Sequence, residues 1–339
     1  MPTIGLLGAT GYTGTLTTSE LIKRGIPHVL GGRNPEKLNR LPGDAERRVV
    51  DTSDPASLAA FCEGLDAVIS CIGPFVLYGD AVVDACVEAG VPYVDSTGEL
   101  AFIEGVYQRH ANATSPIVPT CGFDVIPGDL AADLACKAIE ADGGTVSEVV
   151  ISYALQGTAP SQGTTRTIVT NVTREGWTPR RVHHYGPQGP RAMVSFPYPE
   201  LATVKLARPH TSVTVGMAIP PAMGRMLPAL GVAMRLGRPL IKVGAPLLQK
   251  AVDRMPEGPD PDKRDANTFT IVAEARSTSG EQRQVIVTGQ DPYGLTAAFL
   301  VESAVRVALP SSPVGPLGPA MAFDAADFFE ATSVSWLLA

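Results

Sequence analysis

Residues 8–14 read GATGYTG and directly follow an apolar run at residues 3–7. This order is typical of a buried strand, a tight glycine turn and the start of a helix. Glycines let the backbone approach a pyrophosphate, and the first N–H groups of a helix attract anionic oxygen atoms. We therefore predict a dinucleotide-binding turn, whose contact residues are Gly8, Thr10, Gly11, Tyr12, Thr13 and Gly14.

The residue after the second expected strand indicates which dinucleotide would bind. Chains that bind NAD usually carry an acidic residue there, which holds the ribose 2′-hydroxyl group. This chain has Arg33, whose guanidinium can form two hydrogen bonds with a 2′-phosphate. We interpret the site as one for NADP(H), with Asn34 beside the arginine and Asp51 near the adenine. The alternative for Arg33 is a solvated loop arginine, and the alternative for Asp51 is a loop carboxylate at the end of a strand.

Three polar loops follow the fourth, fifth and sixth expected strands, at residues 71–79, 95–99 and 121–129. The carboxyl ends of parallel strands meet at one edge of a sheet, and open α/β sheets bind their ligands there. We therefore expect these loops to converge on the nicotinamide half of the cofactor. The residues expected beside the nicotinamide ribose are Cys71, Gly73 and Pro74.

A reductase also needs a proton source close to its substrate. No tyrosine of the chain is followed four residues later by lysine, which excludes the usual short-chain dehydrogenase mechanism. The catalytic candidates are polar groups of the three loops, namely Tyr78, Asp95 and Asp124. For Asp124 the alternative is a cap on the following helix. Cys121 is interpreted as a structural thiol rather than a nucleophile, because no histidine is paired with it in the sequence.

Strands and helices that alternate over the first 120 residues must position these loops. Short connections between them predict a parallel, doubly wound sheet of the Rossmann type. The expected strands after the cofactor residues are 48–51, 66–71, 91–94 and 117–120, with helices at 80–89, 100–110 and 129–139.

The pattern becomes strand-rich after residue 139, as in an α+β domain with an antiparallel sheet. The expected strands are 148–155, 193–198, 212–219, 268–276 and 282–288, and a last helix is expected at 293–309. The predicted domains are 1–130 for NADP binding, 131–290 for substrate binding or dimerisation, and 291–339 as a C-terminal helix and tail packing back on the first domain.

Composition excludes several classes of protein. The 339 residues carry a net charge of −7 without a cluster of Lys and Arg, which argues against a nucleic-acid partner. Five cysteines without a C-x-x-C pair predict neither a disulfide framework nor a metal site. A strand begins at residue 3, so we expect no signal peptide and a cytoplasmic protein. No run reaches the roughly 18 apolar residues that a transmembrane span needs.

One apolar stretch covers residues 211–252, and four basic residues interrupt its part up to residue 248. We interpret its later part, from residue 221, as helices that cover a sheet or line an apolar site. The alternative is a basic amphipathic helix that contacts lipid. Either arrangement favours an apolar substrate, such as an unsaturated or carbonyl-bearing acyl chain.

The motifs GATGYTG, GPFVLYG, YVDSTGE and CGFDVIPGD resemble, in order and spacing, those of the saccharopine dehydrogenase-like oxidoreductases. The resemblance covers residues 1–135 well and is looser over 289–297 and 313–323. It implies an NADP-type Rossmann domain with an inserted α/β domain. The family includes trans-acting enoyl reductases of lipid and polyketide pathways, which implies a lipid or polyketide-like substrate. Val125 stands where the third loop more often has serine.

The sequence thus predicts an NADPH-dependent reductase that acts on a small or apolar carbonyl or enoyl substrate by direct hydride transfer. The alternative is a sensor or scaffold that binds NADP(H) and a protein partner without turnover. A third hypothesis is an acyl-phosphate reductase that uses Cys121. A homodimer is also expected, because antiparallel sheets of such second domains often pair across a dimer.

Overall fold

The chain folds into two compact units, seen in a computed structural model. The described residues are 1–157, 165, 181–186, 189–195, 197–219, 250–252, 254–255, 258, 264 and 266–339. Unit 1 comprises residues 1–129 and 292–333, and unit 2 comprises residues 130–291 and 334–339.

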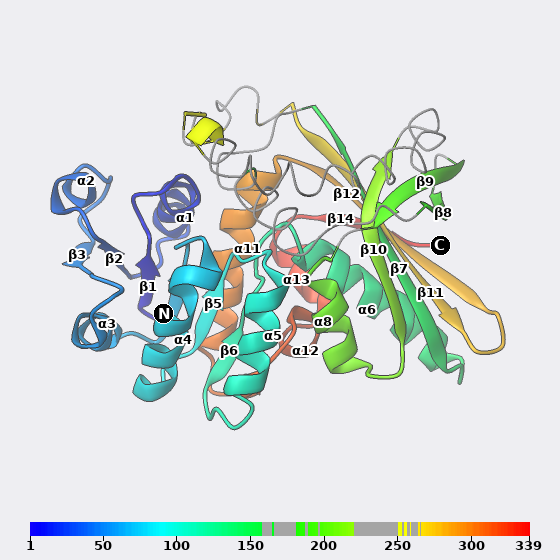
Figure 1. Cartoon of the computed structure of the whole chain (residues 1–339), viewed down its shortest axis with the longest axis horizontal. Helices are drawn as coiled ribbons and strands as arrows, with labels where there is room; N and C mark the ends of the chain where they lie inside the picture. The colour runs from blue at the N-terminus through cyan, green and yellow to red at the C-terminus, as the bar shows by residue number, and fades with distance from the viewer. Residues whose placement is uncertain are drawn as a thin grey trace. The chain divides into compact units, whose positions relative to one another are not determined.

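Unit 1 is built on a seven-stranded parallel sheet of order β13-β6-β5-β4-β1-β2-β3 (Figure 1). This order confirms the expected doubly wound sheet. The chain leaves the centre in opposite directions from β1 and β4, and ligands of such sheets bind at that switch point. The strands are β1 (Ile4–Leu7), β2 (His28–Gly32), β3 (Glu46–Val49), β4 (Ala67–Ser70), β5 (Tyr93–Asp95), β6 (Pro116–Val118) and β13 (Gly315–Pro316).

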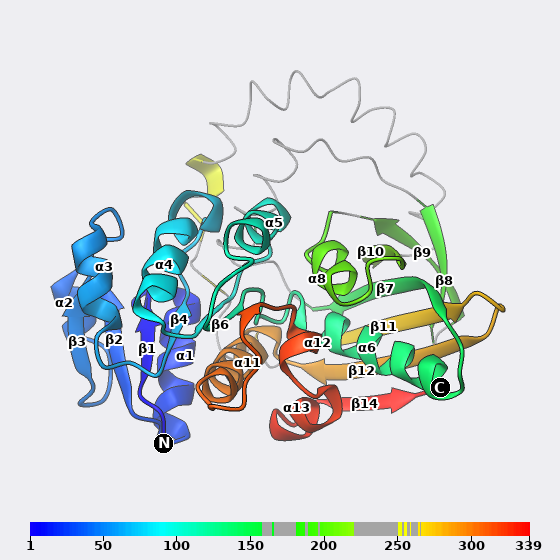
Figure 2. The same ribbon diagram turned by 90° about the horizontal axis from the view of Figure 1, so that it is seen from below.

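Helices cover both faces of this sheet. Figure 2 shows α3, α4 and α5 on one face and α1 and α11 on the other. Every residue of β1, β4, β5 and β6 is buried, which is the pattern of strands covered on both sides. The helices of unit 1 are α1 (Tyr12–Lys23), α2 (Pro35–Asn39), α3 (Pro55–Cys62), α4 (Phe75–Ala89), α5 (Leu100–Arg109), α11 (Pro292–Val307), α12 (Pro319–Ala322) and α13 (Ala325–Ala331). Helix α6 (Ile126–Ala141) starts in unit 1 and belongs mostly to unit 2.

Local sequence explains where these helices begin and end. The Asn34 side chain accepts the Lys37 N–H at 2.9 Å, and the Asp54 side chain accepts the Ala56 N–H at 3.0 Å. Each cap precedes a proline at the first helical position, where the missing N–H costs nothing. Helix α4 ends at Gly90, whose φ of 69° is left-handed.

Several boundaries differ from the expected ones: α4 begins at Phe75 instead of residue 80, and β9 covers Gly189–Ser195 instead of 193–198. Two other differences have a clear local cause. Strand β3 starts and ends two residues before the expected 48–51, because Asp51 instead closes a turn by accepting the N–H of Ser53 at 2.9 Å. Helix α6 begins three residues before Asp129, where the Ile126 N–H already donates to the Gly122 carbonyl at 3.0 Å. In both cases the local turn, which sequence patterning describes poorly, sets the boundary.

Unit 2 contains a second seven-stranded sheet, of order β14-β12-β11-β7-β10-β9-β8. Its pairs are antiparallel except for β10 and β7, which run parallel because β8, β9 and α8 intervene in the chain. The expected sheet is therefore present, but it is mixed rather than purely antiparallel. Its elements are β7 (Val146–Gln156), β8 (Arg181–Gly186), β9 (Gly189–Ser195), α8 (Glu200–Ala207), β10 (Ser212–Ile219), β11 (Thr268–Ser277), β12 (Gln282–Gln290) and β14 (Ser335–Leu338).

The apolar stretch at 211–252 is described only in part. Its strand at 212–219 is confirmed as β10, whereas residues 220–249, where helices were expected, lie outside the described residues. Within the parts of the chain that are described, no helix combines the length and the apolar character needed to cross a bilayer.

Candidate functional site

The glycine turn between β1 and α1 is shaped by three different steric needs. Gly8 has a left-handed φ of 84°, and its N–H donates to the Gly31 carbonyl of β2 at 3.0 Å. A Cβ atom at Gly14 would lie 2.2 Å from the Gly8 carbonyl oxygen, so only glycine permits this approach. Among the described residues, a Cβ atom at Gly11 would meet only that same oxygen, at 3.5 Å. The space beside Gly11 is therefore open, as a dinucleotide pyrophosphate requires.

The first turn of α1 contains no acidic residue, and its N-cap residue is Gly11, which has no side chain to cap the helix. The first N–H groups of a helix lack intrahelical acceptors and attract anions. The turn and the helix start together fit a pyrophosphate, with Thr10 half-buried in the turn and Tyr12 and Thr13 half-buried in the first helical turn.

Arg33 and Asp51 follow the neighbouring strands β2 and β3 at the same edge of the sheet, and both are exposed. The pKa of the Asp51 carboxyl is lowered, first by hydrogen bonds from Ser53 and then by the charge of Arg33. The side-chain oxygen of Asn34 caps α2, and its NH2 group could still donate to a ligand. These three residues thus lie close together at the carboxyl edge of the sheet.

The loop after β4 lies directly against the glycine turn. A Cβ atom at Gly8 would lie 3.0 Å from the carbonyl carbon of Cys71. Burial raises the pKa of the Cys71 thiol to about 12, so this group is neither a nucleophile nor an acid at neutral pH. The next residues, Gly73 and Pro74, are joined by a cis peptide bond, and Gly73 is exposed. The loop after β4 therefore places exposed backbone at the sheet edge, next to the glycine turn.

Glu99 closes the start of α4. Its Oε1 accepts the Phe75 N–H and its Oε2 accepts the Val76 N–H, each at 3.0 Å. The Glu99 side chain is buried, although it comes from the loop after β5. Glu99 directly precedes α5, yet its carboxylate caps the start of α4 and not that of the helix that follows it.

Asp95 is fully buried at the end of β5. Its Oδ1 accepts the N–H groups of Thr97 at 2.8 Å and Thr120 at 2.9 Å, and its Oδ2 accepts the Tyr93 hydroxyl at 2.8 Å. Burial raises the pKa of the Asp95 carboxyl to about 7, although these hydrogen bonds oppose the shift. The carboxylate thus ties the loops after β5 and β6 together, a geometry that favours positioning over direct chemistry.

Asp124 differs from Asp95 in being exposed. Within the described part of the chain its carboxylate accepts no hydrogen bond, so it does not cap α6. A Cβ atom at Gly98 would lie 3.6 Å from Asp124 Oδ2, which places the carboxylate beside the loop after β5. Desolvation by surrounding protein atoms raises the pKa of the Asp124 carboxyl. Asp124 is therefore accessible yet poorly solvated, as a proton donor should be.

The other two groups singled out near these loops have contrasting settings. Tyr78 lies in the first turn of α4, with 41% of the residue exposed. Cys121 is fully buried, its Sγ donates to the Val118 carbonyl at 3.2 Å, and burial raises its thiol pKa strongly. The structural interpretation of Cys121 is thereby supported.

The C-terminal segment adds groups that sequence reasoning missed. The rings of Tyr12 and Tyr293 meet edge to face, with centroids 5.5 Å apart. The Phe123 N–H donates to Thr296 Oγ1 at 3.2 Å. The start of α11 therefore lies beside both the glycine turn and the loop after β6. Its only sequence signal is the DPYGLTA segment at residues 291–297.

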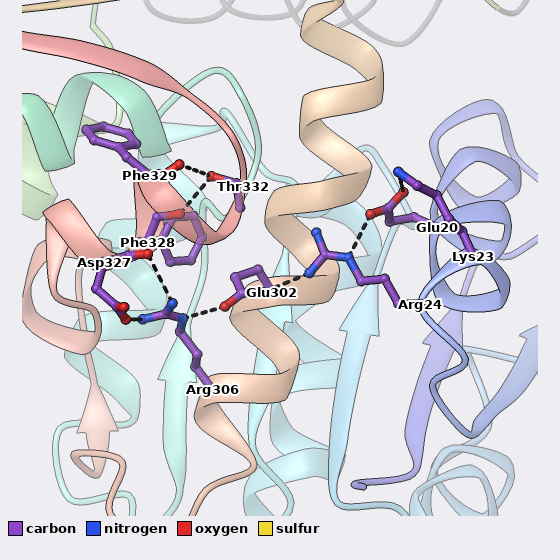
Figure 3. Close-up of polar contacts among 9 residues, drawn as sticks. All are labelled: Glu20, Lys23, Arg24, Glu302, Arg306, Asp327, Phe328, Phe329 and Thr332. Atoms are coloured by element: carbon purple, nitrogen blue, oxygen red, sulfur yellow. Dashed lines mark hydrogen bonds and ion pairs between the residues drawn. The ribbon is translucent and has the colours of Figure 1, made fainter.

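A chain of ion pairs holds α11 in place (Figure 3). Arg24 of α1 contacts Glu20 and Glu302, each at 2.7 Å. Arg306 of α11 contacts Glu302 at 2.7 Å and Asp327 of α13 at 2.6 Å. The first three of these side chains are at most 23% exposed, so the pairs are less screened than surface pairs. This network fixes the helix whose start borders the site.

The structure thus brings the four loops of the carboxyl edge together. Gly8 of the loop after β1 lies against Cys71 of the loop after β4. Glu99 joins the loop after β5 to α4, and Asp95 joins that loop to the loop after β6. Tyr78 and Asp124 are the exposed members, and neither contacts the enclosed Asp95 among the described contacts.

Comparisons with known proteins agree with this geometry. Residues 8–94 match a protein-family model described as NAD(P)H-binding. A probable mitochondrial saccharopine dehydrogenase-like oxidoreductase of Arabidopsis thaliana is 37% identical over 147 residues, which cover 37% of this chain and 32% of the relative. A trans-acting enoyl reductase of Mycobacterium ulcerans is 38% identical over 140 residues, 38% of this chain and 34% of the relative.

The fold has its own counterpart among solved structures. A saccharopine dehydrogenase (L-Glu forming) of Saccharomyces cerevisiae superposes with a TM-score of 0.64 at 12% identity, covering 100% of both chains. The fold and the site define an α/β protein with an NAD(P)H-binding domain at residues 8–94. The resemblance to saccharopine dehydrogenase-like oxidoreductases and trans-acting enoyl reductases is confirmed, although the chain spans about a third of the length of these two curated relatives.

Proposed function

We propose that this protein is an NADPH-dependent reductase that acts on an apolar carbonyl or enoyl substrate. The observation that carries the proposal is the open, uncharged start of α1 beside Gly11, together with Arg33 where NAD-binding chains have an acid. The oxidoreductase names of the two curated relatives support the reaction class.

In this proposal the residues at the ends of β1 to β4 hold the cofactor. Backbone groups of residues 8–14 bind the pyrophosphate, and Arg33 and Asn34 bind the 2′-phosphate. Asp51 lies on the adenine side, and Cys71, Gly73 and Pro74 border the nicotinamide side. When bound, NADPH supplies a hydride. The protein's own task is to orient the reactants, exclude water and deliver a proton.

Asp124 is the proposed proton donor. Its carboxyl is exposed and accepts no hydrogen bond from the described residues, and its raised pKa lets it keep a proton to higher pH than an ordinary carboxyl. Tyr78 is the second candidate, because its hydroxyl is carried by an exposed residue on the first turn of α4. In this scheme Asp95 positions the loop that carries Asp124, through the N–H of Thr120.

The proposed substrate is apolar and lipid- or polyketide-like. Leu77 and Tyr78 are 63% and 41% exposed, so the first turn of α4 presents apolar surface at the ligand-binding edge of the sheet. Exposed large apolar side chains at such an edge favour an apolar ligand. The name of the relative from Mycobacterium ulcerans, a trans-acting enoyl reductase, supports an unsaturated acyl substrate.

Two measurements test the proposal in sequence. Calorimetry should give clearly tighter binding of NADPH than of NADH, and equal affinities would contradict the role of Arg33. NADPH oxidation should then be screened against enones, aldehydes and ketones with apolar chains. Tight NADPH binding without turnover across that screen would favour the sensor or scaffold instead.

A further inference from the structure

The start of α4 is held by a carboxylate from another loop. Both oxygens of Glu99 are used, one by the N–H of Phe75 and one by the N–H of Val76, each at 3.0 Å. Glu99 is 5% exposed, and no lysine, arginine or histidine of the described chain pairs with it. The partial positive charge of the helix start therefore takes the place of a counter-ion.

The carboxylate itself is fixed from behind. The Glu99 N–H donates to Thr97 Oγ1 at 3.1 Å, and the Thr97 N–H donates to Asp95 Oδ1 at 2.8 Å. That oxygen also accepts the Thr120 N–H at 2.9 Å. A continuous series of hydrogen bonds thus runs from the loop after β6, through the loop after β5, to the start of α4.

We propose that Glu99 is a positioning residue, which holds the Gly73–Pro74 backbone where it borders the nicotinamide half of the cofactor. The inference rests on the proposed function, because it assumes that NADPH lies along this edge. Gly73 and Pro74 directly precede the two N–H groups that Glu99 binds, so displacing the carboxylate would displace them. The phosphate half lies at α1, which Glu99 does not touch.

The division between the two cofactor halves gives a selective test. Glu99→Gln keeps the side-chain length and one acceptor but removes the charge and places an NH2 group against one backbone N–H. NADPH should then bind about tenfold more weakly, because the loop beside its nicotinamide half is misplaced. Adenosine 2′,5′-bisphosphate, which lacks that half, should bind within about twofold of its affinity for the unaltered protein.

Asp54→Asn is the matched control. It also replaces a helix-capping carboxylate by an amide, but at α3, and should leave both affinities unchanged. Thr97→Val is a milder second variant, which removes only the Oγ1 that supports Glu99. It should show the same selective loss at smaller size, so the proposal stays testable if Glu99→Gln folds poorly.

Hydrogen exchange at the Phe75 and Val76 amides provides a readout that does not depend on the cofactor. Both amides should exchange faster in Glu99→Gln than in Asp54→Asn. Equal weakening of the two ligands, or faster exchange with unchanged NADPH affinity, would overturn the positioning role. Failure of the unaltered protein to bind NADPH would instead reject the proposed function, and the inference with it.

Discussion

The starts of α1 and α4 lie at the same edge of one parallel sheet and are built in opposite ways. The α1 start has a glycine as its N-cap residue and no acidic residue in its first turn, and among the described residues the space beside Gly11 is open. The α4 start is filled by the buried carboxylate of Glu99. Both helix starts attract anions, and the protein's own carboxylate occupies the start of α4, whereas we propose that a phosphate of the cofactor occupies the start of α1.

The difference shows how a glycine-containing loop can serve as scaffold rather than as a ligand site. In the segment GPFVLYG, Phe75 is buried with its ring centroid 5.7 Å from that of Phe102. A Cβ atom at Gly79 would lie 2.5 Å from the Phe102 ring. Phe75 and Gly79 therefore pack α4 against α5, while Gly73, Leu77 and Tyr78 of the same segment stay exposed.

The largest effect should come from closing the open helix start. Gly11 has a φ of −80°, so Gly11→Val should fold normally while its branched side chain fills the pyrophosphate space. We expect NADPH affinity to fall by more than about 100-fold, because the phosphates lose their contact with the backbone. Calorimetry measures the affinity, and near-normal binding would place the phosphate site elsewhere.

Gly14→Ala provides the contrast within the same turn. Its Cβ atom would lie 2.2 Å from the Gly8 carbonyl oxygen, a backbone atom that cannot move freely. We expect a loss of about 1–3 kcal/mol in the free energy of unfolding, the usual cost of overpacking. Urea unfolding measures this loss, and a variant as stable as the unaltered protein would contradict the packing role of Gly14.

Asp124→Asn tests whether the proton donor is carried by the loop after β6. The substitution keeps the shape and removes the ionisable proton. Turnover should fall by about 100-fold while NADPH affinity stays nearly constant, because general acid catalysis contributes on that scale. Single-turnover kinetics and calorimetry separate the two quantities. Unchanged turnover would transfer the proton-donor role to Tyr78 or to a bound water.

Arg33→Ala tests the part of the proposed cofactor site that would bind the 2′-phosphate. Loss of a charge-assisted contact to the 2′-phosphate should weaken NADPH binding by about 1.5–3 kcal/mol. NADH, which lacks that phosphate, should bind as before. Titration of both cofactors against both proteins checks the prediction, and equal loss for NADH would indicate a structural role for Arg33.

Asp95→Asn tests the hydrogen bonds that support Glu99 at the start of α4. The folded pKa of about 7 lies above that of an unfolded aspartate, so the folded state holds a proton that the unfolded state has lost between about pH 4 and 7. The contribution of Asp95 to stability is therefore full at low pH and is lost as pH rises through 7.

Compared with Asp95→Asn, the unaltered protein should lose stability across that range by up to about 1.4 kcal/mol per pH unit. Urea unfolding at a series of pH values measures the difference. A difference between the two proteins that does not vary with pH would mean that Asp95 titrates normally.

Local chemistry made much of unit 1 predictable. Alternating strands, the caps Asn34 and Asp54 and the glycine turn each depend on residues close together in the chain. The parallel, doubly wound sheet followed from short connections between strands and helices. Elements whose identity depends on distant partners were missed, including α8 and the edge strands β8 and β14.

The acids of the loops could not be ranked from sequence. Asp95 and Asp124 both follow a strand within a glycine-containing motif, yet one is fully buried and the other exposed. Glu99 meets the N–H of Phe75 from 24 residues away, a distance over which spacing carries no information. The packing of whole loops, and not local pattern, decides which carboxylate is buried among hydrogen-bond donors and which is exposed.

A crystal structure with NADP⁺ bound tests the comparison between the two helix starts most directly. We predict the pyrophosphate beside Gly11 at the start of α1, the 2′-phosphate on Arg33, and Glu99 still bound to the N–H groups of Phe75 and Val76. A phosphate at the start of α4 with Glu99 displaced would contradict the account.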